Sequence, residues 1–269
     1  MSAAAGTARP SLFRSLRVQG RVIVALMIRD VHARYGGEGL GFFWIIAEPL
    51  ILTCGVILLW TLTRRVEAGH RISVVLFGLT AYSHIQLWRL SVLSSMLIVR
   101  REAWLYYHRN VTAVDLIIAR TLIHSLGIFA SFWIVYLAGL LFGVFDPPSS
   151  IFITIAAWGL DTFFVLSASV FIAGLSELSD IVEKLIHPLL YLTLPVTGAF
   201  SLTNWLPAKA QVFVIWSPLA NVCEMFRAGL LSEAVKTVWN VPFVLIASLL
   251  LLTIGLPLVE YGRKTVAVN

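Results

Sequence analysis

The stretch that decides the fold runs from Leu116 to Phe145 and reads LIIARTLIHSLGIFASFWIVYLAGLLFGVF. Arg120, near its start, is its only residue with a permanent charge at neutral pH. About 20 consecutive apolar residues in an α-helix are enough to cross the hydrocarbon core of a bilayer. The sequence therefore predicts a transmembrane helix here.

Apolar runs of this kind recur along the chain, and the fold class follows from them. The predicted spans cover about residues 42–63, 72–99, 116–145, 151–175, 185–202 and 241–259. The fifth run is short and contains Pro188 and Pro195, so we expect it to kink or to be only partly inserted. We predict an all-α integral membrane protein with six transmembrane helices. Residues 1–40 form a cytoplasmic interface region and residues 41–269 the transmembrane domain.

Composition agrees with a membrane protein and argues against a soluble one. Hydrophobic residues make up 59% of the chain, charged residues only 13%, and the mean hydropathy is +0.88. Ordinary soluble domains contain about 25% charged residues. The net charge of +6 does not indicate nucleic-acid binding, because the basic residues flank apolar runs rather than form a patch. They are more numerous on the side of the predicted topology that holds both termini, which places both termini in the cytoplasm.

The first forty residues have the pattern of an amphipathic helix rather than of a span. At about 100° per residue, one face is apolar and the opposite face is cationic. The apolar face contains Leu12, Leu16, Ile23 and Met27, and the cationic face contains Arg14, Arg17 and Arg21. Such a helix suits a membrane surface with anionic headgroups. A disordered basic tail is the alternative.

Residues 100–115 read RREAWLYYHRNVTAVD and predict a short helix with an aromatic face between two spans. Aromatic side chains beside cationic ones are typical of an interfacial anchor. The same side chains would also suit a helix that docks onto a cytoplasmic partner, and both interpretations stay open. Asp115 is placed to cap the N-terminus of the third span.

Residues 203–240 form a long outer connection with amphipathic character. Trp205, Trp216 and Trp239 suit a membrane surface. Glu224 and Arg227 stand at i, i+3 and are able to pair on one helix face. We therefore expect short periplasmic helices at the outer mouth, before the last span.

Motifs for catalysis, nucleotide binding or metal binding are absent from the sequence. It contains no G-x-x-x-x-G-K-[ST] loop, no G-x-G-x-x-G, no H-E-x-x-H and no G-x-S-x-G. The spacing of its Cys, His and acidic residues fits no metal site. We predict no catalytic residue, metal or cofactor in this chain, so ATP hydrolysis would have to come from another one.

Charged residues inside predicted spans are costly and usually face an interior, a cavity or an interface. Arg89 suits a polar passage or a structural pair equally well, and Arg120 suits an interface anchor. Asp161 is able to pair with one of these arginines. In the third span, Phe132, Trp133 and Tyr136 belong to an aromatic stripe, which is typical of packed core or lipid contact but also suits a path for a sugar chain. The candidate passage residues are Tyr82, Arg89, Phe132, Trp133, Tyr136 and Asp161.

Three stretches resemble one family, the membrane (permease) subunit of type-2 ABC polysaccharide exporters, and among these the capsular polysaccharide exporter permease. RDVHARYGGEGLGFFWIIAEPL, from Arg29 to Leu50, is similar to the family's N-terminal signature. DLIIAR, at 115–120, resembles the opening of its third span. Ser217-Pro218-Leu219, followed by Glu224 and Arg227, resembles its late N-P-L…E…R segment, with Ser217 in place of the usual Asn.

The resemblance implies a homodimer that pairs with two copies of a cytoplasmic ATPase, which would bind ATP and Mg²⁺. The cargo would be a lipid-linked polysaccharide crossing the bacterial inner membrane. A periplasmic co-polymerase and an outer-membrane polysaccharide channel would be further partners. The implied coupling helix contains Arg100, Arg101, Trp104, Leu105, Tyr107, His108 and Arg109.

Three other functions remain open at this point. An O-antigen or teichoic-acid exporter permease differs mainly in its cargo. An ABC drug or lipid exporter permease would share the membrane architecture. An integral membrane transferase would need clustered acidic residues near the cytoplasmic surface, and Asp115, Glu177, Asp180 and Glu183 form no recognisable metal-binding motif.

Overall fold

The computed structural model describes residues 12–35, 41–63, 73–107, 111–199, 202–231 and 237–266. Within these ranges the regular structure is entirely helical. The α-helices are α1 (Leu12–Tyr35), α2 (Gly41–Thr63), α3 (Val74–Ser95), α4 (Ile98–Arg101), α5 (Ala113–Leu141), α6 (Ile151–Leu178), α7 (Asp180–Leu192), α8 (Ala208–Ile215), α9 (Pro218–Leu230) and α10 (Val241–Val266). The 3₁₀ helices are η1 (Ala103–Tyr107), η2 (Leu194–Thr197) and η3 (Thr203–Trp205).

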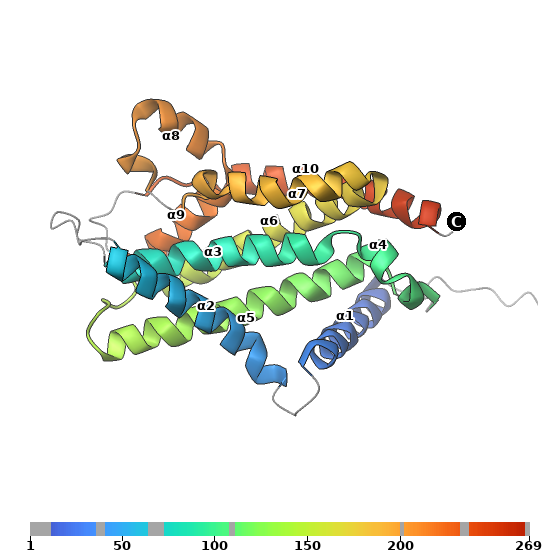
Figure 1. Ribbon diagram of the computed structural model, residues 1–269, viewed down its shortest axis with the longest axis horizontal. Helices are drawn as coiled ribbons and strands as arrows, with labels where there is room; N and C mark the ends of the chain where they lie inside the picture. Colours follow the sequence, from blue (N-terminus) through green and yellow to red (C-terminus); the bar gives the residue numbers. More distant parts are fainter. Residues whose placement is uncertain are drawn as a thin grey trace, which may run out of the picture.

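The long helices form an elongated bundle with two distinct ends (Figure 1). Helices α3, α5, α6, α7 and α10 follow the long axis, and α2 crosses it obliquely. One end, here called the α4 end, carries α1, α4 and the last turns of α10. The opposite end, here called the α8 end, carries α8 and α9.

Three of these helices are long and apolar enough to cross a membrane. They are the stretches Ala113–Leu141, Ile151–Leu178 and Val241–Thr265. A shorter apolar stretch, Phe43–Val56, lies within α2. The predicted all-α membrane class is therefore confirmed for the described part of the chain.

The structure corrects the bounds of three predicted spans. The span predicted at 116–145 is α5, which covers Ala113–Leu141 and ends before Phe145. The run 72–99 is broken after Ser95, because Leu97 has a left-handed backbone with φ 51° and the chain turns into α4. The run 185–202 is not one helix, because α7 begins at Asp180 and ends at Leu192. Pro195 follows in η2, where a proline cannot donate the hydrogen bond that would continue an α-helix. The expected interruption of the fifth span is thus confirmed at Pro195, whereas Pro188 lies inside α7 and the predicted helical extent was wrong.

The start of α5 shows how a local signal sets a helix boundary. Thr112 is the N-cap, and its side-chain oxygen accepts a hydrogen bond from the backbone N–H of Asp115 at 3.2 Å. The Asp115 carboxylate in turn accepts from the backbone N–H of Thr112 at 2.9 Å. This reciprocal capping box satisfies two N–H groups that a helix start leaves without partners. Asp115 therefore takes part in the cap, as predicted, but at the N3 position, and Thr112 is the N-cap.

Close backbone packing holds α6 against α10. A Cβ atom added to Gly255 of α10 would lie 2.7 Å from the backbone nitrogen of Phe171 in α6. A Cβ atom added to Gly174 of α6 would lie 2.5 Å from the Cβ atom of Leu258 in α10. Small residues let membrane helices approach in this way. The two helices therefore form one tightly packed unit, and α9 packs onto it through Gly229.

Candidate functional site

The candidate site is the turn at the α4 end, formed by α4 and η1 and here called the coupling segment (residues 98–107). It is held to the end of α6 by Glu177, whose carboxylate accepts the backbone N–H groups of Val99 at 2.8 Å and Arg100 at 3.4 Å. The Arg100 guanidinium lies 3.3 Å from the same carboxylate. A negative charge at the start of a helix satisfies its unpaired N–H groups. Glu177 thus fixes where the coupling segment begins.

An apolar core fixes the middle of the coupling segment. Ile98, Val99 and Leu105 are buried in a cluster with Leu116 of α5 and Val259 of α10. The segment therefore cannot move without disturbing the packing between α5, α6 and α10.

The coupling segment presents other side chains outward. Trp104 is 59% exposed, and the side chains of Arg100 and Arg101 are about half exposed. Arg101 also lies 3.8 Å from Glu183 of α7. An exposed tryptophan beside cationic groups on a rigid base is suited to binding another protein. His108, Arg109 and the side chain of Tyr107, which were predicted to belong to this surface, lie outside the described residues.

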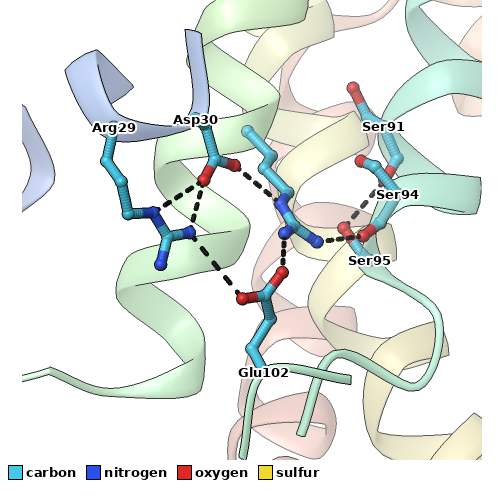
Figure 2. Close-up of polar contacts among 7 residues, drawn as sticks. Arg29, Asp30, Ser91, Ser94, Ser95 and Glu102 are labelled. Atoms are coloured by element: carbon cyan, nitrogen blue, oxygen red, sulfur yellow. Dashed lines mark hydrogen bonds and ion pairs between the residues drawn. The ribbon is translucent and has the colours of Figure 1, made fainter. Parts of the chain in front are cut away.

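Four charged residues join the coupling segment to α1 and α5. Figure 2 shows Asp30 and Glu102 converging on one guanidinium, which belongs to Arg120. Arg29 approaches the same two carboxylates from the other side. Arg120 Nε donates to Asp30 at 2.9 Å, its Nη1 donates to the carbonyl oxygen of Ser94 at 3.0 Å, and its Nη2 donates to Glu102. The predicted interface anchor is therefore the centre of an ion network.

Arg29 completes this network from the α1 side. Its guanidinium donates to Asp30 through Nε at 3.1 Å and lies 3.8 Å from Glu102. It also lies 5.5 Å from the ring centre of Trp104, within range of a cation–π contact. Burial works against the charged form of Asp30, but hydrogen bonds from Arg29 and Arg120 and the charges of these two residues outweigh it and hold the pKa of Asp30 below its usual value. Asp30 is therefore a carboxylate at physiological pH.

Helix α1 uses its faces for different contacts. Leu26 and Asp30 are buried against the bundle, with Ile23 and Met27 packed partly beside them. Another face leaves apolar side chains exposed, and the cationic Arg17 and Arg21 are exposed as well. The exposed apolar residues are Phe13, Leu16, Val24 and Ile28. The predicted apolar face is thus divided between protein packing and exposure, and the side chains of Leu12 and Arg14 lie outside the description.

Arg89 and Asp161, which sequence reasoning left as possible partners, have separate contacts. Arg89 donates to the hydroxyl of Tyr191 at 3.1 Å and stacks on its ring at 4.8 Å. Asp161 is fully buried and lies 2.7 Å from Nδ1 of His84, also buried. The pairing of Asp161, which the sequence left open, is therefore with His84 of α3 and not with an arginine.

The candidate passage residues divide into buried and accessible sets. Phe132 and Tyr136 pack in the core, and the Tyr136 hydroxyl donates to the carbonyl oxygen of Asp146 at 2.9 Å. Together with Asp161 they are enclosed inside the subunit, so in this conformation they line no open passage. Tyr82, Arg89 and Trp133 keep partly accessible side chains. The aromatic stripe thus acts mainly in packing here.

At the α8 end, Glu224 and Arg227 are buried rather than exposed at a mouth, and they contact different groups. Glu224 accepts the backbone N–H groups of Thr203 at 2.8 Å and Val238 at 3.2 Å. Arg227 donates to the carbonyl oxygens of Gly198 at 2.6 Å and Ala199 at 3.0 Å. Both side chains therefore hold the segments that precede and follow α8 and α9 against α9. The i, i+3 spacing allowed these two residues to pair, but in the structure each one contacts other groups.

Sequence reasoning missed Asp30, Glu102 and Glu177 as site residues. One signal was available, because an arginine near the start of a span needs a counter-charge. It did not identify the counter-charge, since Asp30 stands 90 residues from Arg120 and Glu102 stands 18 residues from it.

Comparisons with known proteins point to one kind of protein. No family model matches the chain. It is 32% identical over 255 residues to the capsule polysaccharide export inner-membrane protein BexB of Haemophilus influenzae, covering 94% of this chain and 95% of that protein. It is 30% identical over 258 residues to the capsule polysaccharide export inner-membrane protein CtrC of Neisseria meningitidis serogroup B, covering 96% and 97%. The polysialic acid transport protein KpsM of Escherichia coli is 24% identical over 250 residues, covering 90% and 93%.

Proposed function

The chain belongs to the family of capsule polysaccharide export inner-membrane proteins, and from that premise we propose that it works as a homodimer driven by a separate cytoplasmic ATPase. It is the transmembrane subunit of a capsular polysaccharide exporter in the inner membrane. Two copies of the ATPase would bind ATP and Mg²⁺, and the cargo would be a lipid-linked glycan. The names of the relatives favour capsule over O-antigen or teichoic acid as the glycan.

The proposed topology has six spans with both termini in the cytoplasm. Helices α2, α3, α5, α6 and α10 would supply five spans. Helix α7, with 13 residues, is about 20 Å long, so it would need the η2 turn to help cross a core of about 30 Å. The basic residues of the α4 end favour the cytoplasm for that end. Helix α1 would then lie on the inner membrane surface, with Arg17 and Arg21 near anionic headgroups.

The coupling segment is the proposed docking site for the ATPase. The observation that carries this proposal is its combination of a fixed base and an exposed tip: Glu177 and Leu105 anchor it, while Trp104 stays 59% exposed. A force applied to the tip would reach α5, α6 and α10 through the buried cluster. Closure of the ATPase would then move the helices of the dimer apart or tilt them, so that a glycan can pass.

Glycan contact and envelope partners complete the proposal. Tyr82, Arg89 and Trp133 are candidates for glycan contact because their side chains are partly accessible. Phe132, Tyr136 and Asp161 would join them only if the helices separate. A periplasmic co-polymerase and an outer-membrane polysaccharide channel would receive the glycan at the α8 end.

Removal of the Trp104 side chain tests the docking role. We expect Trp104→Ala to lower surface capsule by about tenfold or more, because tryptophan is enriched among the few interface residues whose truncation costs about 2 kcal/mol or more of binding. Surface capsule should be quantified in a deletion strain that expresses the variant, and ATP hydrolysis should be measured on the purified complex.

Trp216→Ala is the matched control, because Trp216 is 70% exposed at the α8 end. It should retain an intact ATPase complex and wild-type ATP hydrolysis, because the α8 end lies opposite the proposed docking site. Normal capsule in the Trp104→Ala strain, at equal amounts of protein in the membrane, would refute docking through this segment.

A further inference from the structure

We infer that Arg120 is a positioning residue that passes movement of the coupling segment to the surface helix α1. The inference rests on the proposed docking of an ATPase. It adds a second effect of the movement of the coupling segment, which is a shift of α1. Helix α1 would shift together with the coupling segment during each transport cycle, rather than serve as a passive anchor.

The contacts of Arg120 join four elements through one guanidinium. The residue itself belongs to α5, Asp30 to α1, Ser94 to the last turn of α3, and Glu102 to the connection between α4 and η1. A guanidinium presents several N–H donors in a rigid plane, so its partners hold fixed positions relative to one another. Displacement of Glu102 therefore changes the geometry of the Asp30 contact.

Burial gives these contacts their strength. The side chain of Arg120 is 12% exposed, that of Asp30 6% and that of Glu102 16%. Ion pairs on an open surface contribute little, whereas removal of one partner of a buried pair leaves an uncompensated charge. Arg29 supports the same arrangement, because it contacts Asp30 and approaches both Glu102 and Trp104.

A second polar contact between α1 and α5 allows two roles to be distinguished: transmission of movement through Arg120, here called the relay, and simple attachment of α1 to α5. Gln19 donates to Asp115, whose carboxylate also serves the capping box of α5. Gln19 and Asp30 are 11 residues apart, about three helical turns, so both face α5. The Gln19 contact does not involve Glu102. Loss of it should loosen α1 without interrupting the path from the coupling segment.

The experiment places spin labels on both ends of the proposed path. Ala103→Cys reports on the exposed coupling segment and Val24→Cys on an exposed position of α1. A Cys54→Ser background removes the exposed native thiol, since Cys223 is buried. The complete transporter with its ATPase is reconstituted in vesicles, and spectra are compared before and after trapping with ATP and vanadate. Glycan export per ATP hydrolysed is measured in parallel.

With Arg120 present, both labels should respond to trapping. In Arg120→Met, the label at position 103 should still respond. The label at position 24 should respond much less, with a residual response through the direct contacts of Arg29 with Glu102 and Trp104, and export per ATP should fall by about tenfold. Asp30→Asn is the second variant, because it weakens the contact between Arg120 and α1, together with the Arg29–Asp30 pair within α1, and leaves Arg120 with Glu102 and Ser94. Gln19→Leu is the matched control and should retain both responses.

Two results would overturn the inference. One is an undiminished response at position 24 in both Arg120→Met and Asp30→Asn. The other is a loss of that response in Gln19→Leu as large as in Asp30→Asn. If trapping does not change the spectrum of the label at position 103 when Arg120 is present, the docking proposal is overturned. The inference about Arg120 then fails as well.

Discussion

Arg227 illustrates what a single buried charge does in this protein. It is fully buried, donates to Thr80 of α3 at 3.1 Å and to the carbonyl oxygens of Gly198 and Ala199, and lies 4.0 Å from the ring centre of Phe77. The two carbonyl groups belong to the turn after η2, where Gly198 has φ +70°. One side chain therefore ties α9 to α3 and to that turn.

Replacement of Arg227 should destabilise the protein strongly. We expect Arg227→Met to lower the free energy of unfolding by about 3 kcal/mol, because it leaves buried carbonyl groups without their donors. Denaturation of the purified protein by SDS in mixed micelles measures the change. Arg263→Met is the control, since Arg263 is exposed and pairs with Glu260 on the same helix, and it should cost less than about 1 kcal/mol. Equal losses in the two variants would contradict the role given to Arg227.

At the scale of elements, glycine decides how closely α6 and α10 approach. Gly255 faces backbone atoms of Phe171, so an added methyl group cannot be accommodated by rotating a side chain. Gly159, which belongs to α6, has open space where its Cβ atom would be. The same substitution should therefore have different effects at these two positions.

We expect Gly255→Ala to lower the free energy of unfolding by about 1–3 kcal/mol, because the helices must separate. Gly159→Ala should be neutral or stabilising by less than about 1 kcal/mol, since alanine has the higher helix propensity. The SDS titration described for Arg227 applies to both. Tolerance of alanine at position 255 would mean that α6 and α10 are not in close contact in the membrane.

The ion network around Arg120 and the capping box at Thr112 differ in how far apart their residues lie along the sequence. The capping box joins residues three positions apart, so the sequence was enough to predict the role of Asp115. The network brings together residues from α1, the coupling segment and α5. Its members became recognisable as a site only when these elements were packed together.

At the scale of the whole molecule, the proposed topology places the α4 end in the cytoplasm and the α5–α6 connection outside. In a Cys54→Ser background, Asp146→Cys should react with a membrane-impermeant maleimide added to intact cells, because Asp146 is exposed in that connection. Ala103→Cys should react only after the inner membrane is permeabilised. The opposite pattern would reverse the orientation, and labelling of both positions from outside would contradict the proposed topology.

The residues that line a glycan passage were the hardest feature to predict from the sequence. An aromatic stripe on α5 has the same spacing whether it faces lipid, core or a sugar chain. The structure buries Phe132 and Tyr136, and it pairs Asp161 with His84 rather than with an arginine. Each of these outcomes depends on which helix lies opposite, and helical spacing alone does not specify that neighbour.

The sequence by itself determined the membrane class, the approximate positions of most long helices, the part that Asp115 plays in capping α5 and the resemblance to polysaccharide exporters. These properties depend on hydropathy and short motifs, which are local to each segment. Only the tertiary structure decided the partners of the buried charges, such as Asp30 and Glu102 for Arg120. The physical reason is that a buried charge is stabilised by whatever group faces it, and that group is set by the packing of helices far apart in the chain.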